Sequence, residues 1–356
     1  MCAMSQFQWH THALRCLTRA IVSQLDQPAL VVQNHSMSWN IFITRPIPSN
    51  GLDLLRKNGM TLRCHDQEIP LSRSELLSQL VPCDGVIVTG GERVDAEFFA
   101  AAPKLKVVSC VAVGYDNVDL AEATRRRVAV TNTPDVLNNA VADLTWALLL
   151  GVARRVVEGD RLARSGEWQG LAPMLLLGVD VAGKTLGIIG AGRIGTEVAR
   201  RGTGFSMRLL YSARNDKPEM NVLGAQGLSF DEVLRESDFL CVHVPLTRET
   251  RHMFGEDQFR KMKPSAFFIN MARGAVVDET ALVRALREGW IAGAGLDVYE
   301  HEPKISPELA SMRNTLLLPH IGSATVETRQ RMSVMAAENL LAVLNGQRCP
   351  NIVNPF

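Results

Sequence analysis

The stretch TLGIIGAGRIGTEVARR, residues 185–201, decides the fold that the sequence predicts. Its first five residues form a largely apolar run that leads directly into glycines with the spacing G-x-G-x-x-G at Gly190, Gly192 and Gly195, and a helical pattern follows. Strand, glycine turn and helix in this order form the phosphate-binding turn of a doubly wound sheet that binds dinucleotides. We expect Gly190 to permit the tight turn, Gly192 to let the backbone approach a pyrophosphate, and Gly195 to let helix and strand pack closely.

The end of the next predicted strand, Arg208–Tyr211, bears on the choice of dinucleotide. In NAD-binding sheets an acidic residue here holds the adenine ribose 2′-hydroxyl, whereas this chain continues with Ser212, Ala213 and Arg214. A hydroxyl and a guanidinium can bind a 2′-phosphate through charge-assisted hydrogen bonds. The sequence therefore predicts NADP(H) as the preferred cofactor, with NAD(H) as the alternative. Asp216 argues against this preference, and a solvent-facing Arg214 is the competing interpretation.

Alternating strand and helix patterns extend in both directions from this turn. The expected strands are 41–43, 85–88, 105–108 and 128–130 in a first series and 185–189, 208–211, 239–242, 266–270, 293–297 and 315–318 in a second. A long helical pattern at 137–155 separates the two series, and another at 325–344 ends at Asn345-Gly346. Short strands that alternate with helices indicate βαβ units. The predicted fold class is therefore α/β with parallel sheets.

Composition and charge exclude several classes of protein. A chain of 356 residues exceeds what one core usually organises, so we expect two domains. Lys and Arg number 38 against 37 Asp and Glu, which leaves a net charge of +1 and no basic footprint for nucleic acid or an anionic membrane. The most apolar stretch, 144–152, is too short to cross a bilayer. The seven scattered cysteines predict a reducing, cytoplasmic location and no metal site.

Residues 1–38 precede the first expected strand, and we interpret them as a disordered or non-native extension. Residues 1–36 show little hydrophobic periodicity and contain Asp26 as their one acidic residue. A true start at Met37 and a disordered tail are the first two interpretations. A transit peptide is the third, although the segment lacks a clear amphipathic stripe.

Arg273, Glu302 and His320 follow the last three expected strands. The carboxyl ends of parallel strands meet at the sheet edge where ligands bind. Reduction of a carbonyl builds negative charge on its oxygen, so the reaction needs a cation to stabilise the charge and an acid to protonate the oxygen. Arg273 and His320 supply these groups. A carboxylate at Glu302 that accepts a hydrogen bond from the imidazole would orient the ring and favour its protonated form.

Further motifs lie on both sides of the glycine turn: VGYDNVD at 113–119, TPDVL at 133–137, NMARG at 270–274, GLDVY at 295–299 with Glu302-Pro303, and PHIGS at 319–323. With these motifs and the glycine turn, the chain resembles the D-isomer-specific 2-hydroxyacid dehydrogenases from residue 39 to residue 356. Segments 211–214 and 175–184 are most similar to those of NADPH-dependent glyoxylate and hydroxypyruvate reductases. The resemblance implies reduction of glyoxylate, hydroxypyruvate or similar short 2-oxo acids to D-2-hydroxy acids such as glycolate and D-glycerate.

The resemblance also implies roles for individual residues. Arg273 would bind the substrate carboxylate and carbonyl, His320 would donate the proton, and Glu302 would pair with His320. Backbone N–H groups of Val113 and Gly114 would hold the substrate carboxylate. The implied cofactor contacts are Arg193 and Ile194 at the pyrophosphate, Val244 and Pro245 on the adenosine side, Asp297 at the nicotinamide carboxamide, and Met271, Ala272, Gly322 and Ser323 within the neighbouring motifs.

The implied architecture consists of two Rossmann-like or flavodoxin-like parallel-sheet domains with the active site in the cleft between them. Residues 39–136 and 322–356 would form the substrate-binding catalytic domain, and residues 137–321 the dinucleotide-binding domain. The resemblance further implies a homodimer in which the helix carrying Trp146 and Leu148–Leu150 pairs with its copy, with burial inside one subunit as the alternative.

Two alternative functions compete with the leading one. The first is a D-3-phosphoglycerate-type dehydrogenase, against which the basic residues after Tyr211 argue. The second is a dinucleotide-sensing regulatory protein, because transcriptional corepressors similar to this family use the same fold.

Some further residues lend themselves to more than one interpretation. His243 lies at a strand end, and we expect it to line the cofactor site or to be structural rather than catalytic. Asp116 and Asn117 are expected to form a turn and to cap a helix that starts near Leu120. The loops around 45–49 and 89–91, together with Trp168, are expected to shape the substrate pocket.

Overall fold

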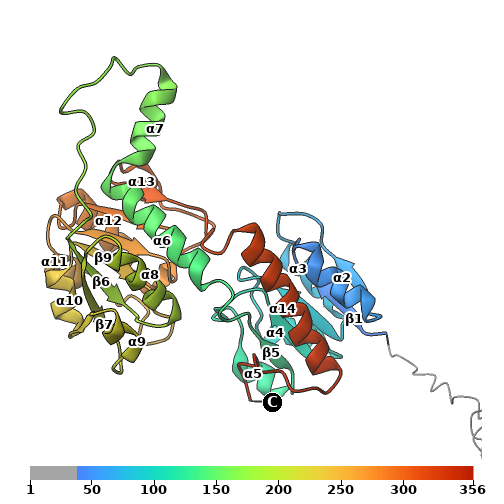
Figure 1. Ribbon diagram of the computed structural model, residues 1–356. Coiled ribbons are helices and arrows are strands. Elements are labelled where there is room, and N and C mark those ends of the chain that lie inside the picture. Colours follow the sequence, from blue (N-terminus) through green and yellow to red (C-terminus); the bar gives the residue numbers. More distant parts are fainter. Residues whose placement is uncertain (1–37, 356) are drawn as a thin grey trace, which may run out of the picture. The chain divides into compact units, whose positions relative to one another are not determined.

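Two parallel β-sheets form the framework of residues 38–355, the part of the chain that the computed structural model describes (Figure 1). The predictions for residues 1–37 lie outside the described residues. The five-stranded sheet has the order β2-β1-β3-β4-β5, and the seven-stranded sheet the order β12-β11-β10-β9-β6-β7-β8. Neighbouring strands are parallel in both sheets, which confirms the predicted α/β class with two parallel sheets.

The strands are short, and most are buried on both faces, as expected for parallel sheets covered by helices. The first sheet contains β1 (Asn40–Ile43), β2 (Thr61–Cys64), β3 (Gly85–Val88), β4 (Val107–Cys110) and β5 (Ala129–Thr131). The second contains β6 (Thr185–Ile189), β7 (Arg208–Ser212), β8 (Gln226–Gly227), β9 (Phe239–Val242), β10 (Phe267–Asn270), β11 (Gly293–Leu296) and β12 (Thr315–Leu317). In the second sheet β6 lies between β7 and β9, so the order of strands reverses at the glycine turn.

The sequence analysis missed β2 and β8, and its count of six strands in the second series was wrong by one. Both missed strands lie at sheet edges. β2 carries Arg63 and is only partly buried, and both residues of β8 are exposed. Strands in such positions lack the continuous apolar run by which the buried strands were recognised.

Helices connect the strands, and the last one returns to the first sheet. The helices are α2 (Ser49–Lys57), α3 (Arg73–Leu80), α4 (Ala96–Ala101), α5 (Leu120–Arg125), α6 (Asn138–Ala153), α7 (Val156–Ser165), α8 (Arg193–Thr203), α9 (Pro218–Val222), α10 (Phe230–Glu236), α11 (Glu256–Lys261), α12 (Glu279–Glu288), α13 (Pro307–Ser311) and α14 (Val326–Leu344). In α14, the Ala336 carbonyl accepts a hydrogen bond from the Ser109 hydroxyl of β4 at 2.9 Å. Thus α14 packs on the five-stranded sheet, although it follows β12 in the chain.

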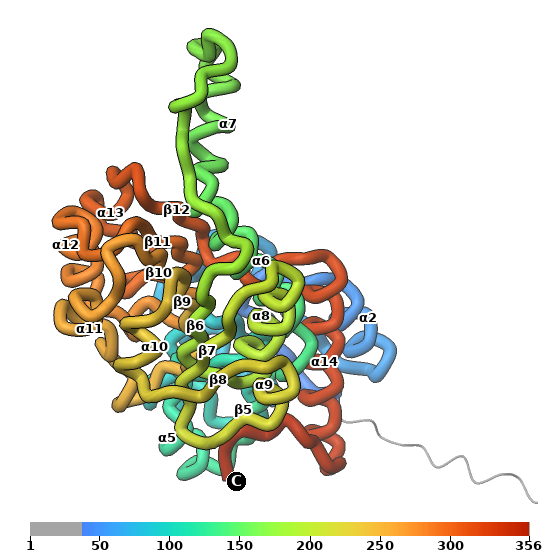
Figure 2. Tube along the Cα trace, turned by 60° about the vertical axis from the view of Figure 1, so that its left-hand side comes forward, coloured from blue at the N-terminus to red at the C-terminus, as the bar shows by residue number. Residues whose placement is uncertain are grey.

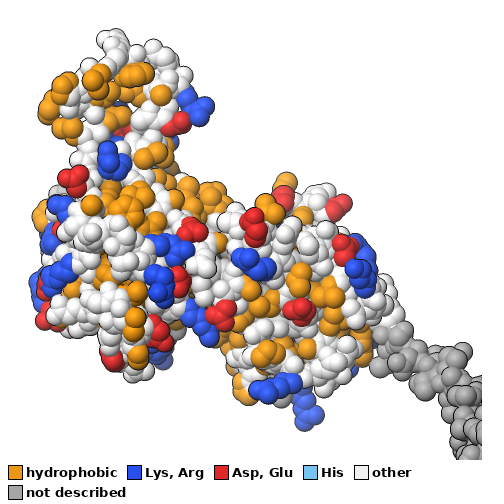
Figure 3. Space-filling model, viewed as in Figure 1, with side chains coloured by type: hydrophobic (Ala, Val, Ile, Leu, Met, Phe, Trp, Pro, Cys, Tyr) orange, Lys and Arg blue, Asp and Glu red, His pale blue; other side chains and the backbone are white. Residues whose placement is uncertain are grey.

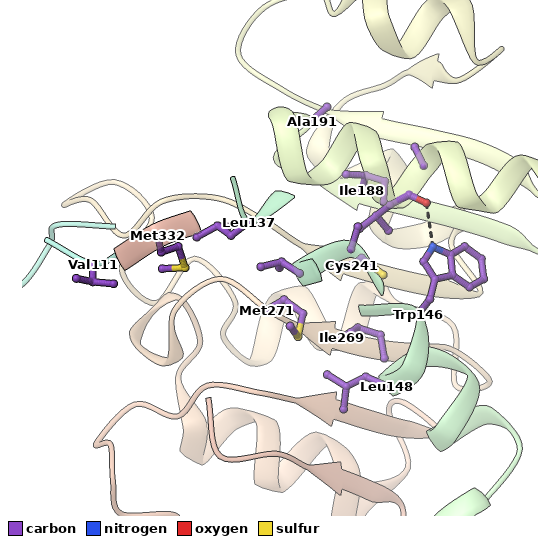
Figure 4. Packing of buried hydrophobic residues seen from close by; sticks show 14 of the residues in the cluster. Val111, Leu137, Trp146, Leu148, Ile188, Ala191, Cys241, Ile269, Met271 and Met332 are labelled. Atoms are coloured by element: carbon purple, nitrogen blue, oxygen red, sulfur yellow. Dashed lines mark hydrogen bonds between the residues drawn. The ribbon is translucent and has the colours of Figure 1, made fainter. Parts of the chain in front are cut away.

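For Trp146, Leu148 and Leu149 the structure favours the alternative, burial within one subunit, while Leu150 is half-buried and the pairing of this helix with its copy stays a prediction. All three side chains are buried within the single chain. Figure 4 shows Trp146 and Leu148 in this packing. The indole of Trp146 stacks on Phe205 with ring centroids 4.6 Å apart, and its N–H donates to the Val198 carbonyl at 3.0 Å. The apolar face of α6 is therefore used inside the subunit, against α8 and the second sheet.

The exposed apolar surface lies instead on α7 and the segment 166–179 that follows it. This arm extends beyond α6 (Figures 1 and 2), and apolar side chains gather on it (Figure 3). Trp168, Leu171, Met174 and Leu177 are each more than half exposed, and Leu171 is 96% exposed. No helix among residues 38–355 combines the length and apolarity needed to cross a membrane.

Candidate active site

The glycine turn has the geometry that its sequence predicts. Gly190 has φ of +96°, and a Cβ atom there would lie 2.7 Å from the His243 carbonyl carbon, so only glycine fits. A Cβ at Gly195 would lie 2.4 Å from the Gly190 carbonyl oxygen. Nothing lies within 4 Å of a Cβ at Gly192, and no side chain caps α8 at this residue. The helix N-terminus is thus open to an anion at the point where the strand order reverses.

Arg193, the first residue of α8, is exposed and pairs with a carboxylate. Its Nε lies 3.0 Å from Oδ1 of Asp135, which belongs to the TPDVL motif before α6. Ile194 beside it is partly buried against the core. The side chain of Arg193 is therefore held at the glycine turn by a solvent-exposed ion pair, which a stronger anion can replace.

The residues after β7 form a small polar cluster. Asp216 accepts hydrogen bonds from the Tyr211 hydroxyl at 2.8 Å and from the Asn221 amide. The hydrogen bonds from Tyr211 and Asn221 lower the pKa of the Asp216 carboxyl. Ser212 is half-buried and Arg214 is exposed. Hydrogen bonds from Thr247 and the backbone lower the pKa of the Glu249 carboxyl, and the nearby charge of Arg214 makes a smaller contribution in the same direction. Asp216 therefore already has hydrogen-bond partners in Tyr211 and Asn221. Glu249 is an acidic residue near Arg214 that the sequence analysis missed.

Arg273 follows β10 and reaches the loop after β4. Its Nε donates to Oδ1 of Asp116 at 2.9 Å, and its Nη1 donates to the Ala272 carbonyl at 2.8 Å. A Cβ atom at Gly114 would lie 1.7 Å from Nη2 of Arg273, so the guanidinium lies directly against the backbone of Gly114. The Asn270 side chain braces this turn by donating to the Arg273 carbonyl and accepting from the Ala272 N–H.

The helix-capping role expected for Asp116 and Asn117 was wrong. Asp119 is the N-cap of α5 and accepts from the Glu122 N–H at 3.0 Å. Asp116 pairs with Arg273, and Asn117 donates to the backbone of the loop after β3. Asp116 and Asp119 are three residues apart, and either carboxylate could cap a helix. Only the fold shows that Asp116 faces the guanidinium of Arg273, which is 157 residues away in the chain.

His320 and Glu302 come together at the ends of β12 and β11. Nδ1 of His320 lies 2.8 Å from Oε2 of Glu302, and Oε1 of Glu302 accepts from the Tyr299 N–H at 3.0 Å. Burial on its own would raise the pKa of the Glu302 carboxyl, but the hydrogen bond and charge of His320, with a smaller contribution from Arg273, lower it overall. Within residues 38–355, Nε2 of His320 has no hydrogen-bond partner and so is free to meet a ligand.

Asp297 connects the ends of the same two strands. Its buried carboxylate accepts from the N–H groups of Ile321 and Gly322 at 2.8 and 2.7 Å. Burial raises the pKa of this carboxyl, although the two backbone hydrogen bonds and the charge of His320 act in the opposite direction. The contacts hold the backbone next to His320, a role that the sequence analysis did not assign to Asp297.

His243 lies apart from the His320 pair. It follows β9, and neither of its buried ring nitrogens has a hydrogen-bond partner among the described residues. Burial lowers the pKa of His243 to about 3, so the imidazole is neutral at physiological pH. Its backbone N–H donates to the Ile189 carbonyl at 2.8 Å, which places it beside the glycine turn rather than beside Arg273.

The other residues expected at the site lie at the ends of the same strands. Val113 and Gly114 follow β4 and are half-buried, Val244 and Pro245 follow β9, Met271 and Ala272 are buried after β10, and Gly322 and Ser323 follow His320. Their contacts with substrate and cofactor stay predictions. In the described part of the chain, no group of three or more His, Cys, Asp or Glu side chains is placed to hold a metal ion.

Comparisons with known proteins show which family the chain resembles. Residues 146–322 match the model of the D-isomer specific 2-hydroxyacid dehydrogenase, NAD binding domain. A glyoxylate reductase from Thermococcus onnurineus (strain NA1) is 51% identical over 323 residues, which cover 89% of this chain and 96% of that protein.

Solved structures give the same result. A protein from Thermus thermophilus superposes with a TM-score of 0.84 at 47% identity, over 88% of this chain and 99% of that one. An NADPH-dependent glyoxylate/hydroxypyruvate reductase from Sinorhizobium meliloti, in complex with NADP and malonate, has a TM-score of 0.78 at 34% identity, over 88% and 96% of the two chains.

Proposed function

Because the chain belongs to the D-isomer specific 2-hydroxyacid dehydrogenase family, we propose that it reduces glyoxylate, hydroxypyruvate and similar short 2-oxo acids to D-2-hydroxy acids with NADPH. Relatives named glyoxylate reductase, about half of whose residues are identical to this chain, support the substrate class. The observation that carries the proposal is the 2.8 Å contact between His320 and Glu302 beside Arg273, since it supplies an oriented acid next to a cation.

A nicotinamide dinucleotide fits the residues present. The pyrophosphate would lie against Gly190–Gly195 and Arg193, where the glycines leave the backbone open and the N-terminus of α8 is uncapped. Ile194, Val244, Pro245, Met271, Ala272, Asp297, Gly322 and Ser323 would line the remainder of the site. When bound, the cofactor supplies the hydride.

The side chains of this protein would then act on the oxo acid. The guanidinium of Arg273 and the N–H groups of Val113 and Gly114 would bind the substrate carboxylate. Arg273 would also stabilise the negative charge that develops on the carbonyl oxygen. His320 would donate its proton from Nε2, because Nδ1 is engaged by Glu302. Glu302 would keep the ring oriented and balance its positive charge.

The preference for NADPH rests on the residues after β7. Ser212 and Arg214 can bind a 2′-phosphate, and Asp216, which argued for NAD, is hydrogen-bonded to Tyr211 and Asn221. The Sinorhizobium meliloti enzyme of similar fold binds NADP. If kcat/KM is higher with NADH than with NADPH, this part of the proposal is wrong.

Oxidation of NADPH by glyoxylate and hydroxypyruvate, followed by absorbance, tests the main proposal. The purified protein should turn over both acids, and Arg273→Ala should lower kcat/KM by about 10²-fold or more, since the variant loses a charged donor to developing charge. A folded protein that binds NADPH and turns over no short 2-oxo acid would overturn the proposal in favour of a regulatory role.

We also propose that the enzyme is a homodimer. The second copy would cover segment 166–179 of the arm rather than α6. Exposed apolar patches of this kind mark interaction sites. Leu171 and Met174, the most exposed of the arm's large apolar residues, are 96% and 78% exposed. Light scattering after size exclusion should give twice the monomer mass, and Leu171→Glu with Met174→Glu should give the monomer mass. Monomeric wild-type protein would contradict the proposal.

A further inference from the structure

A second histidine–carboxylate pair includes Glu300, two residues before Glu302. Nε2 of His252 lies 2.6 Å from Oε1 of Glu300. An ionised carboxylate only accepts hydrogen bonds, so the ring of His252 donates from Nε2. The side chain of Glu300 is 14% exposed and that of His252 is 44% exposed, so the contact is partly shielded from water. The function proposed above uses neither of these residues.

His252 also contacts the residues that follow Arg273, through its backbone. Its N–H donates to the Ala275 carbonyl at 2.9 Å. A parallel β-bridge two residues further along continues this contact. His252 therefore joins two segments of the proposed site, because its backbone is bonded to the segment after Arg273 and its ring to the loop that carries Glu302.

The backbone conformation of His252 is uncommon. Its φ is +51°, in the left-handed region that residues other than glycine seldom adopt. Such a conformation costs free energy, and it persists where the surrounding structure holds the residue on more than one side. The Ala275 carbonyl holds the N–H of His252, and Glu300 holds its ring. Residues in such conformations cluster at functional sites.

Glu300 is held a second time at the N-terminus of α12. Its Oε2 accepts from the Glu279 N–H at 3.2 Å, and Oε2 of Glu279 accepts from the Glu300 N–H at 3.1 Å. A helix N-terminus stabilises a carboxylate. Oε1 of Glu279 accepts from the Ser306 N–H at 3.3 Å. The loop is therefore held at Glu300 and at Ser306, whereas residues 301–304 between these two points are exposed.

The loop also packs closely on the segment after Arg273. A Cβ atom on Gly274 would overlap the Tyr299 carbonyl and the backbone nitrogen of Glu300. Gly274 has no positive φ, so the close approach is what requires glycine here. The Tyr299 N–H donates to Oε1 of Glu302 at 3.0 Å. A displacement of Glu300 would therefore move the neighbouring N–H group that holds the Glu302 carboxylate.

We propose, resting on the function proposed above, that His252 is a positioning residue for the reduction of the oxo acid. Its ring holds Glu300, and Glu300 holds the loop that presents the Glu302 carboxylate to His320 at 2.8 Å. Without the ring, the α12 N–H would be the remaining partner of the Glu300 carboxylate among the described residues. A looser loop would misalign Glu302 and slow proton donation by His320, while substrate binding would change little.

His252→Ala tests the positioning role through its separate effects on kcat and KM. The variant should lower kcat for glyoxylate about fivefold, less than the loss expected for Glu302 itself, because Glu302 remains but is less well aligned. KM should stay within about twofold of wild type, since Arg273 is held separately by its hydrogen bond to Asp116. An unchanged kcat would overturn the proposal.

His252→Gln is the conservative variant. It should keep kcat within about twofold of wild type, because its side-chain amide can donate to Glu300 in place of the ring. His65→Ala is the matched control, since Nε2 of His65 also lies at hydrogen-bond distance, 2.8 Å from the Ile69 carbonyl oxygen, but after β2 of the other sheet. A loss in His65→Ala equal to that in His252→Ala would contradict the assignment.

A double-mutant cycle separates positioning from a general structural effect. If His252 acts through Glu302, His252→Ala should lower kcat about fivefold in the wild type but less than about twofold in the Glu302→Ala background, where no carboxylate is left to align. A general structural effect would lower kcat by the same factor in both backgrounds. Equal factors would therefore overturn the proposal.

Amide hydrogen exchange follows the loop without the need for turnover. In His252→Ala, the amides of residues 299–306 should exchange about fivefold or more faster than in wild type, while those of β6 stay unchanged, because the loop loses one of the contacts that hold it. Unchanged exchange in this loop, with an active wild-type enzyme, would overturn this inference and leave the proposed function intact. Wild-type protein that reduces no short 2-oxo acid would overturn both.

Discussion

His320 and His243 each follow a strand of the seven-stranded sheet, yet their surroundings give them opposite properties. His320 is half-exposed and hydrogen-bonded to a carboxylate, with one ring nitrogen open to a ligand. The ring nitrogens of His243 are buried, and desolvation lowers its pKa to about 3. A histidine at a strand end is therefore not sufficient for proton donation, and the carboxylate partner and access to solvent distinguish the two.

Replacement of His320 should have the largest effect. His320→Gln should lower kcat for glyoxylate by about 10²- to 10⁴-fold, the range for loss of a general acid. The Kd for NADPH, measured by fluorescence, should stay the same. A decrease in kcat of less than threefold would contradict the role of His320 as the proton donor, and with it the contrast to His243.

Replacement of Glu302 should have a smaller effect, because the imidazole remains. Glu302→Gln should lower kcat by about tenfold or more, since the imidazole loses the carboxylate that orients it through Nδ1. Steady-state rates with glyoxylate measure the effect. An unchanged kcat would show that Glu302 does not act through His320.

The stability of the pair should depend on pH with a definite sign. The pKa of Glu302 is lower in the folded chain than its ordinary value. The ionised carboxylate therefore stabilises the fold above the unfolded value, about 4.3, and this contribution is lost as the pH falls through the lower folded value. Urea unfolding should show the difference between wild type and Glu302→Gln shrinking below about pH 4.3. A difference that grows at acid pH would contradict the sign.

Asp116 and Asp119 allow a matched test of how Arg273 is positioned in the site. Asp116→Asn should raise KM for glyoxylate by about tenfold, because it weakens the charge-assisted hydrogen bond that positions Arg273. Asp119→Asn should leave KM unchanged, since asparagine also caps helices. Steady-state kinetics of both variants measure the effect, and equal KM values would remove the positioning role of Asp116.

Replacement of His243 should have the smallest effect, and it concerns stability. His243→Leu removes a buried ring with unpaired nitrogens, so the free energy of unfolding should be unchanged or higher by about 1 kcal/mol. Urea unfolding at pH 7 measures it. Destabilisation by more than about 2 kcal/mol would show that the ring has a partner that matters.

The sequence predicted the parts of the molecule that depend on local patterns. Buried strands such as β6 and β10 are continuous apolar runs, and the glycine turn carries its own spacing, so both were recognised directly. The edge strands β2 and β8 were missed because exposed residues remove that run. The burial of Trp146 within one subunit was predicted only as the alternative, since an apolar helix face alone does not tell a subunit interface from a core.

At the site, residue types were easier to predict than their partners. Arg273, Glu302 and His320 were predicted because each follows a strand and each has the chemistry that carbonyl reduction needs, and the structure brings Glu302 and His320 into contact. The partner of Arg273 was not, because Asp116 and Asp119 both fit a helix cap in sequence and only tertiary structure separates them. The hydrogen bond that Asp297 accepts from the Ile321 N–H likewise joins residues that are 24 positions apart.

A crystal structure of the complex with NADP and a non-reactive 2-oxo acid analogue tests the convergence of the three side chains most directly. The account predicts that Nε2 of His320 lies at hydrogen-bond distance, about 3 Å, from the analogue's carbonyl oxygen. It also predicts that Arg273 contacts the analogue's carboxylate while Nδ1 of His320 stays on Glu302. An analogue bound away from His320, or with Arg273 on neither of its oxygen-bearing groups, would contradict it.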